Sequence, residues 1–277
     1  MRCTIRFLMN LIKNNRKKSN LQKKKHNKFV LITGGLGFLG SFFSEVLINK
    51  KFKVIILDKN NPKTEKQKKL VKKSYLFQQM DITSEIQIID FLKKIKKNQI
   101  KIDYLINNAA VDSVPKKLSL NSHLPDIKTW NYELSVSLTG SYLMIKYFGE
   151  EMAKRKFGKI VNIGSDFSVI APNQDLYSDY KNFLKPVTYS VIKHGMLGMT
   201  RYFASLYSKK NIQVNMLSPG PVFNNQKNVF VKKLLKFIPM KRMARKDDLN
   251  EAMLFLLNDN NSYYTGQNLI VDGLSLI

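Results

Sequence analysis

Two hydrophobic patterns alternate along most of the chain. Short continuous apolar runs that end in turn residues are typical of strands buried on both faces of a sheet. Apolar residues that recur every three or four positions are typical of helices with one buried face. The expected strands are 28–33, 53–58, 75–81, 102–111, 158–165, 212–220 and 267–273. The expected helices are 39–50, 83–97, 127–155, 189–210 and 247–258.

This alternation predicts the fold class. Strands that follow helices one after another are joined by right-handed crossovers, so they lie parallel in one sheet. We therefore expect an α/β protein with a Rossmann-type, doubly wound parallel sheet of about seven strands. Neither an internal repeat nor a linker divides residues 29–277, which predicts a single domain.

The composition adds a strong positive charge to this picture. The 277 residues carry a formal net charge of +27, and segment 1–28 holds ten Lys or Arg and no acid. Such a charge favours nucleic acid, an anionic membrane or an acidic substrate. Lys, Asn and Ile are all abundant, however, and aromatic residues do not interleave with the basic runs, so we predict no specific nucleic-acid partner. Segment 1–28 is compatible with a transit peptide, a disordered tail or an upstream start codon, and we favour a solvated tail without a catalytic role.

Cysteine and histidine usage predicts no metal site. Cys3 is the only cysteine, and His26, His123 and His194 lack the spacing of metal ligands. An internal disulfide is impossible with one cysteine. The apolar runs fall short of the roughly 18 residues that a membrane span needs. We expect no membrane span and a cytoplasmic location.

The stretch "KFVLITGGLGFLGSFF" at 28–43 carries the first candidate chemistry. It fits both G-x-G-x-x-G, read from Gly35, and T-G-x-x-G-x-x-G, read from Thr33. A glycine turn between a strand and a helix lets backbone N–H groups and the helix dipole meet a pyrophosphate. Asp58 ends the next strand 18 positions after Gly40 and is placed to accept the ribose hydroxyls. Its charge repels a 2′-phosphate, which favours NAD over NADP, although the neighbouring Lys59 weakens this preference.

The stretch "YSVIK" at 189–193 carries the second set of residues with candidate chemistry. Residues four apart lie on one face of a helix, so Lys193 is placed beside the phenol of Tyr189. A free tyrosine loses its proton only near pH ~10, and a neighbouring positive charge favours the phenolate. This pair therefore suits proton transfer near neutral pH.

Several motifs in order resemble the short-chain dehydrogenase/reductase family. They are Thr33-Gly34, "NNAA" at 107–110, Ser165 of "IVNIGS", "YSVIK", Asn215 and "SPGPV" at 218–222, with a family-like closing segment at 239–273. The resemblance spans nearly all of 29–277. It implies that Ser165 hydrogen-bonds the substrate oxygen, Tyr189 is the acid/base, and Lys193 holds the nicotinamide ribose and favours the phenolate.

The resemblance also implies a set of cofactor-binding residues. They are Thr33, Gly34, Gly37, Phe38, Leu39, Gly40, Asp58, Asp81, Ile82, Asn107, Asn108, Ala109, Tyr189, Lys193, Pro219, Gly220 and Val222.

Three features depart from the family pattern. The active-site asparagine of the family lies seven positions after a tryptophan, and from Trp130 that position is Ser137. A hydroxyl cannot donate and accept with separate atoms as an amide does, which puts the proton relay in doubt. Residues 166–187 widen the gap between Ser165 and Tyr189 and are rich in Asp, Asn and Tyr, so we expect this loop to select the substrate. The glycines at 34, 37 and 40 follow the family's longer, sugar-nucleotide-handling branch, whereas the other motifs resemble the shorter one.

These observations lead to one preferred function and two alternatives. We expect an NAD(H)-dependent oxidoreductase that interconverts a secondary alcohol and a ketone on a sugar-like or nucleotide-activated sugar. The helix at 189–210 with "SPGPVFNNQ" resembles dehydrogenases of bacterial surface-sugar pathways such as flagellin modification. A 3-oxoacyl-carrier-protein reductase is the alternative enzyme, and a dinucleotide-sensing or nucleic-acid-binding protein is the alternative of another class. The two long helices at 127–155 and 189–210 occupy the positions where relatives form a dimer interface, so we expect a homodimer or homotetramer.

Overall fold

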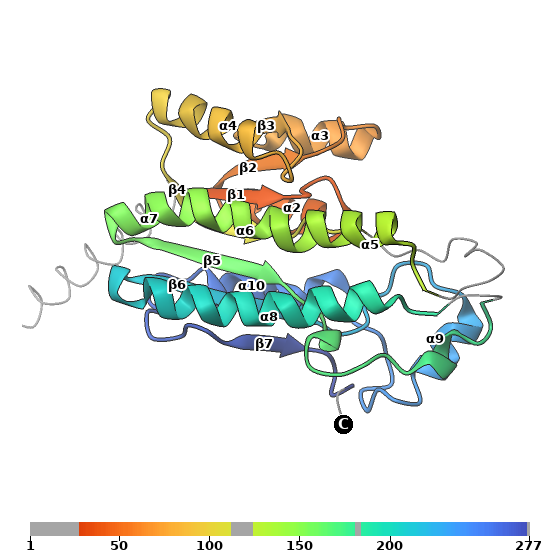
Figure 1. Ribbon diagram of the computed structural model, residues 1–277. Coiled ribbons are helices and arrows are strands. Elements are labelled where there is room, and N and C mark those ends of the chain that lie inside the picture. The colour runs from red at the N-terminus through yellow and green to blue at the C-terminus, as the bar shows by residue number, and fades with distance from the viewer. Residues whose placement is uncertain (1–27, 112–123, 181–183, 276–277) are drawn as a thin grey trace, which may run out of the picture.

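A parallel sheet with helices on both faces forms the described part of the chain, which in this computed structural model is residues 28–111, 124–180 and 184–275 (Figure 1). The strands are β1 (Phe29–Thr33), β2 (Lys53–Asp58), β3 (Leu76–Gln79), β4 (Ile102–Asn107), β5 (Gly158–Ile163), β6 (Ile212–Pro219) and β7 (Asn268–Val271). All seven pair in parallel, in the order β3-β2-β1-β4-β5-β6-β7. The predicted α/β, doubly wound, single-domain fold is confirmed. The expected basic segment 1–28 lies outside the described residues except for Lys28.

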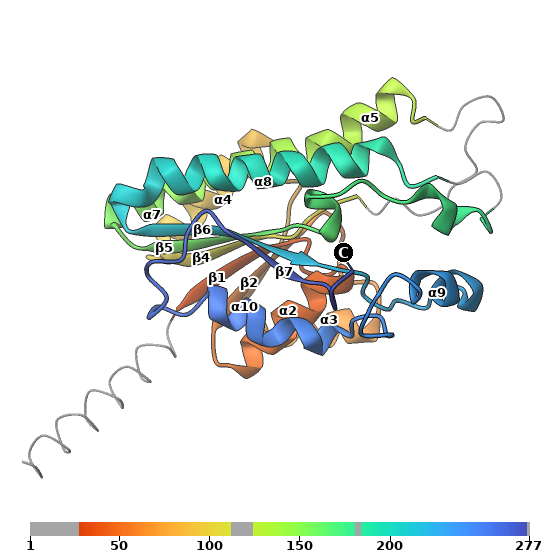
Figure 2. The ribbon, with the colours of Figure 1, turned by 90° about the horizontal axis from the view of Figure 1, so that it is seen from below.

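Two helical layers cover the sheet, as Figure 2 shows from below. The helices are α2 (Phe38–Asn49), α3 (Glu65–Lys73), α4 (Glu85–Lys97), α5 (Ile127–Leu134), α6 (Gly140–Met144), α7 (Glu150–Arg155), α8 (Val187–Tyr207), α9 (Asn228–Leu234) and α10 (Asn250–Leu256). One apolar core joins the sheet to α4, α6, α7 and α8, and a second joins it to α2, α3 and α10. This burial on both faces explains why the strands read as continuous apolar runs.

The strand order reverses between β1 and β4, which lie side by side although β2 and β3 separate them in sequence. The loops that follow these two strands therefore leave in opposite directions and open a crevice at the carboxyl ends of the strands. Ligands of doubly wound sheets bind in this crevice. The glycine turn follows β1 and the "NNAA" segment begins at the end of β4, so both candidate motifs lie at its edges.

Two parts of the fold differ from the sequence-based expectation. The long helix expected over 127–155 is α5, α6 and α7 joined by two π-helical turns at 135–139 and 145–149. Helices α3 and α9 were not expected. Each is short and buries a single leucine, Leu70 in α3 and Leu234 in α9.

Candidate active site

The glycine turn between β1 and α2 forms one wall of the site. Gly34 has a φ of +62°, which an L-residue adopts only with strain. The N–H of Gly37 donates to the Gly34 carbonyl at 3.0 Å, which closes the turn. A Cβ on Gly40 would lie 2.1 Å from the Gly34 oxygen, so only glycine fits there. The first N–H groups of α2 have no partner within the helix and are available to an anion.

Thr33 and Asn108 fix this turn to the end of β4. The Thr33 hydroxyl accepts the backbone N–H groups of Asn108 and Ala109, each at 3.0 Å. The Asn108 amide donates to the carbonyls of Thr33 and Gly34 at 3.0 Å. This explains why the threonine of the turn and the "NNAA" motif occur together: each completes the hydrogen bonds of the other.

A cleft of about 650 Å³ runs along the turn and across the crevice. The expected cofactor residues that line it are Gly34, Gly37, Phe38, Leu39, Asp58, Asp81, Ile82, Asn108, Ala109, Tyr189 and Lys193. Thr33, Gly40 and Asn107 do not line it; Thr33 and Asn107 are buried, and Gly40 supports the turn from behind. Pro219, Gly220 and Val222 line a neighbouring cavity instead.

Two carboxylates, those of Asp58 and Asp81, line the cleft. Asp58 Oδ2 accepts the Leu36 N–H and Oδ1 accepts the Asn60 N–H, both at 3.0 Å. A carboxylate has about four acceptor positions, so Asp58 can also accept ribose hydroxyls. Lys59 pairs with Asp81 at 2.9 Å. Partial burial opposes ionisation of Asp81, but the hydrogen bonds from Lys59 and Thr83 outweigh it and lower the pKa of this carboxyl.

The residues of this cleft fit a dinucleotide. The first turn of α2 offers N–H donors for a pyrophosphate, and Asp58, which accepts the N–H of Leu36 in the glycine turn, offers acceptors for a ribose. Tyr189 and Lys193 line the same cleft, and the redox-active ring of such a cofactor would be needed beside them.

Lys193 is buried on α8 and points to the end of β5. Its Nζ donates to the Ile163 carbonyl at 2.9 Å and lies 5.6 Å from the centre of the Tyr189 ring. Burial, and next the positive charge of Lys185, lowers the pKa of Lys193 to about 8. The structure therefore places a cation next to the phenol, with the i, i+4 geometry that the sequence predicts.

Ser165 lies two positions after the end of β5 and is buried. Its hydroxyl donates to Oδ1 of the adjacent Asp166 at 2.6 Å, and the Phe167 N–H donates to the same carboxylate oxygen at 2.9 Å. Burial of Asp166 raises the pKa of its carboxyl, against the opposing effect of these hydrogen bonds. Asp166 is thus a buried acid in direct contact with the expected catalytic serine.

Two further groups surround the phenol. Lys185 Nζ lies 3.8 Å from the centre of the Tyr189 ring, and the Phe167 ring packs edge-on against it at 6.0 Å. Lys185 stands four positions before Tyr189 and Lys193 four positions after it, so two ammonium groups flank one ring. Cations over an aromatic face are attracted to it, and their charge stabilises a phenolate.

A second cavity, of about 600 Å³, adjoins the cleft. Both are lined by Phe38, Leu39, Gly164 and Tyr189, so they meet at the phenol. The polar groups of the second cavity are Ser165, Asp166, Asn173, Tyr177, Tyr180, Lys185, Asn224, Gln226 and Ser275. Most of these belong to the 166–187 segment, of which residues 181–183 lie outside the described part of the chain.

Ser137 is buried in the first π-helical turn, Ser135–Thr139, and lines neither space. A π-helical turn widens the helix and alters its backbone hydrogen bonds, and such turns are frequent at functional sites. Tyr132 and Val136, close to it in sequence, do line the cleft. The position is therefore next to the site although its hydroxyl is not in it.

Sequence reasoning missed a buried chain of polar groups that positions α8. The Asn107 amide donates to the Asn162 side chain at 2.9 Å, and the Asn162 amide donates to Thr200 Oγ1 at 2.8 Å. These two hydrogen bonds link β4, β5 and the helix that carries Tyr189 and Lys193. Their local signal is weak, because only the fold brings the three residues together. Asp166 and Lys185 had clearer signals, an acid after the serine and a lysine at i−4 from the tyrosine.

The described ranges 28–111, 124–180 and 184–275 hold no group of three or more His, Cys, Asp or Glu side chains arranged for a metal ion. Of the helices in these ranges, none is both long and apolar enough to cross a bilayer.

A family model described as enoyl-(acyl carrier protein) reductase matches residues 39–273. The chain is 31% identical over 252 residues to an NAD-dependent glycerol dehydrogenase of Listeria innocua, a match that covers 89% of this chain and 93% of the relative. The chain belongs to the short-chain dehydrogenase/reductase family. It is an NAD(P)-dependent oxidoreductase, as the sequence predicts.

Further relatives extend this result. A 3-oxoacyl-[acyl-carrier-protein] reductase of Buchnera aphidicola from Schizaphis graminum is 30% identical, with 90% of this chain and 98% of the relative covered. A post-translational flagellin modification protein A of Campylobacter coli is 29% identical, with 89% and 97% covered. A short chain dehydrogenase of Leptospira borgpetersenii, crystallised with bound NAD+, superposes with a TM-score of 0.80 at 30% identity, with 91% and 93% covered.

Proposed function

We propose that the protein is an NAD(H)-dependent dehydrogenase/reductase that interconverts a secondary alcohol and a ketone on a sugar-like substrate, including nucleotide-activated sugars of surface-glycan biosynthesis. The observation that carries the proposal is the meeting of the dinucleotide cleft and the second cavity at Tyr189. A substrate in the second cavity would there face both the phenol and the cofactor end of the cleft.

The described side chains can move the proton that this reaction needs. When bound, the nicotinamide ring supplies or takes up the hydride. In ketone reduction, Tyr189 donates its phenolic proton to the substrate oxygen, and in alcohol oxidation the phenolate takes that proton back. Lys193 and Lys185 stabilise the phenolate charge between these steps. Asp166 accepts the only proton of the Ser165 hydroxyl. Ser165 would bind a ketone oxygen by turning this hydroxyl from Asp166 to the substrate.

The cofactor of the proposed reaction is NAD rather than NADP. The relative from Listeria is NAD-dependent by name and the Leptospira enzyme binds NAD+, which confirms the expectation of NAD. The charge of Asp58 disfavours a 2′-phosphate beside it. Lys59, which weakened this argument at the level of sequence, is paired with Asp81 and therefore partly neutralised.

The lining of the second cavity supports a hydroxyl-rich substrate. The Asp166 carboxylate accepts hydrogen bonds from hydroxyls, and the amides of Asn173, Asn224 and Gln226 can both donate to hydroxyls and accept from them. Similarity to a flagellin modification protein is compatible with a role in surface glycosylation.

One observation favours a second candidate, a 3-oxoacyl-carrier-protein reductase. Leu176, Leu234, Phe230 and Phe237 form an apolar wall of the same cavity, which suits an acyl chain. The Buchnera relative has this activity by name.

The experiment that separates the candidates follows NADH oxidation with three ketone classes: keto-sugars, nucleotide-linked keto-sugars and an acetoacetyl thioester. We expect turnover of a keto-sugar, lowered by about 10²–10⁴-fold in Tyr189→Phe, while NADH still binds. Asn224→Ala removes an amide of the second cavity that does not contact Ser165, and it should lower kcat/KM for the keto-sugars only. Preference for the thioester would establish the second candidate, and turnover that survives in Tyr189→Phe would refute the role of the tyrosine.

A further inference from the structure

A cavity outside the active site collects positive charge. It measures about 500 Å³ and lies between α2 and α3, on the outer side of the glycine turn. This volume is within the range of small-molecule sites. Its charged lining residues are Lys66, Lys69, Lys73, Lys246 and Glu45. Four cations against one carboxylate leave a net charge of about +3 around one hollow.

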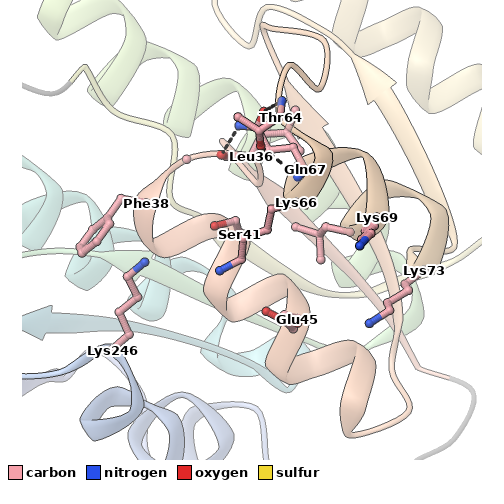
Figure 3. A pocket seen from close by; sticks show the side chains of 12 residues that line it. Leu36, Phe38, Ser41, Glu45, Thr64, Lys66, Gln67, Lys69, Lys73 and Lys246 are labelled. Atoms are coloured by element: carbon pink, nitrogen blue, oxygen red, sulfur yellow. Dashed lines mark hydrogen bonds between the residues drawn. The ribbon is translucent and has the colours of Figure 1, made fainter. Parts of the chain in front are cut away.

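The lysines converge from two separate segments. Lys66, Lys69 and Lys73 are spaced three and four apart, so they share the face of α3 that is turned to α2 (Figure 3). Lys246 approaches the first turn of α2 from the opposite side, and its Nζ lies 3.9 Å from the centre of the Phe38 ring. The fold thus concentrates these charges although the sequence separates Lys246 from α3 by more than 170 positions.

These charges are not neutralised by the described part of the protein. None of the four lysines forms an ion pair in residues 28–111, 124–180 and 184–275, whereas Lys68, on another face of α3, pairs with Glu65 at 2.8 Å. Partial burial, and next the charge of Lys66, lowers the pKa of Lys246. Like charges that repel one another across a cavity bind a multiply charged anion favourably.

The other lining groups indicate the chemistry of that anion. Lysine ammonium groups bind phosphate as point charges, and the hydroxyl of Ser41 adds a donor. Leu36, Phe38 and Leu70 form an apolar wall that would cover an organic portion. The space is too large for one inorganic phosphate ion and suits a phosphate ester with an organic group.

We propose that this cavity, the α2–α3 cavity, is a binding site for a small organic phosphate with two or more negative charges, separate from the bound dinucleotide. Leu36, Gly37 and Phe38 line both the α2–α3 cavity and the cofactor cleft. Gln67 also touches both, and its amide donates to the Leu36 carbonyl at 3.0 Å. Occupation of one site therefore alters the wall of the other, and by linkage each ligand changes the affinity of the other by the same factor.

The test titrates pyrophosphate and ADP into the full-length protein saturated with NADH, by calorimetry at low ionic strength. We expect one bound equivalent of either probe. The variant K69Q/K73Q should bind at least about tenfold more weakly, because two charge-assisted contacts are lost. K68Q/K72Q removes the same charge from other positions of α3 and should change the affinity by less than about twofold.

A single substitution outside α3 tests the site without the risk that the variant disturbs the structure of α3. Lys246→Gln should weaken binding of both probes several-fold while NADH affinity and the unfolding midpoint stay near the wild-type values. The absence of saturable binding, or an equal effect of the two double variants, would overturn the site. Binding that NADH abolishes would assign the probes to the cofactor cleft, and binding that NADPH but not NADH abolishes would assign the lysines to a 2′-phosphate. Either result would also overturn the proposal of a separate site.

Discussion

At the scale of single residues, the electrostatics around Tyr189 decide what the site can do. The phenol lies between two ammonium groups, one buried on Lys193 and one over the ring on Lys185. Each cation favours the phenolate, but each also opposes the charge of the other. The charge that Lys193 brings to the site is therefore limited by Lys185, in addition to the larger effect of burial.

This opposition predicts a change in pH dependence for Lys185→Gln. Lys193 acts as a cation, and its pKa is lowered to about 8, so its contribution is present below that pH and is lost as the pH rises through it. Removal of the Lys185 charge raises the pKa of Lys193. The alkaline limb of kcat/KM should then move upward by a few tenths of a unit to about one unit.

The measurement is a pH profile of alcohol oxidation for the wild type and the variant. Lys227→Gln is the matched control, since Lys227 lies over the Tyr180 ring at 5.0 Å and carries the same charge. An alkaline limb that stays in place in Lys185→Gln, or moves equally in the control, would contradict the role given to Lys185.

The residues proposed to carry the chemistry are easier to predict from the sequence than the side chains that they contact. Ser165, Tyr189 and Lys193 are recognisable because their types and order are specific. The contact of Ser165 with Asp166, and the chain from Asn107 through Asn162 to Thr200, depend on side-chain directions that only the packed fold sets. The placement of Ser137 beside the site, rather than in it, follows from a π-helical turn without a sequence signature.

At the scale of elements, α3 was not expected because the contacts that support it do not appear in the hydrophobic pattern of the sequence. Its sequence "EKQKKLVKK" buries only Leu70, so hydrophobic periodicity gives no signal. The helix is instead supported at its ends. Thr64 and Gln67 form a capping box, Glu65 lies in the first turn, and Lys72 and Lys73 lie in the last turn, which complements the helix dipole. Because α3 was not expected, the α2–α3 cavity could not be derived from sequence.

The turn from β1 to α2 allows a prediction for Gly40→Ala. The added Cβ would lie 2.1 Å from the Gly34 oxygen and 2.6 Å from Asn108 Nδ2, so the turn must open and its hydrogen bonds to the end of β4 must lengthen. We expect a loss of about 1–3 kcal/mol in the free energy of unfolding and a large loss of NADH affinity. Denaturant unfolding and NADH fluorescence titration measure the two effects.

Ser41→Ala is the control for this substitution, because it alters the next residue of α2, which does not line the cofactor cleft. It should keep both stability and NADH affinity. Wild-type affinity for NADH in Gly40→Ala would show that the close contact with Gly34 is not required for the cleft.

At the scale of the whole molecule, one helical face remains to be covered. Helices α6 and α8 are neighbours, with the Tyr142 and Phe203 rings 6.3 Å apart, and they lie on the same side of the sheet (Figure 2). Tyr142, Val191, Tyr202 and Leu206 are exposed along them. Apolar side chains gathered on one face of neighbouring helices are typical of an interaction surface.

We expect two copies of the chain to cover this face in a homodimer with a two-fold axis, in which the same helices pack against each other. Replacing Tyr202 and Leu206 together by Glu places four like charges at the contact and should give monomers in size-exclusion chromatography with light scattering. Ile86→Glu, on the exposed surface of α4, should leave the dimer intact. A wild-type protein that is monomeric at micromolar concentration, or a double variant that keeps the wild-type mass, would show that α6 and α8 are not the interface. The double variant should also keep Tyr189-dependent turnover, because the cofactor cleft and the second cavity are lined by residues of one chain.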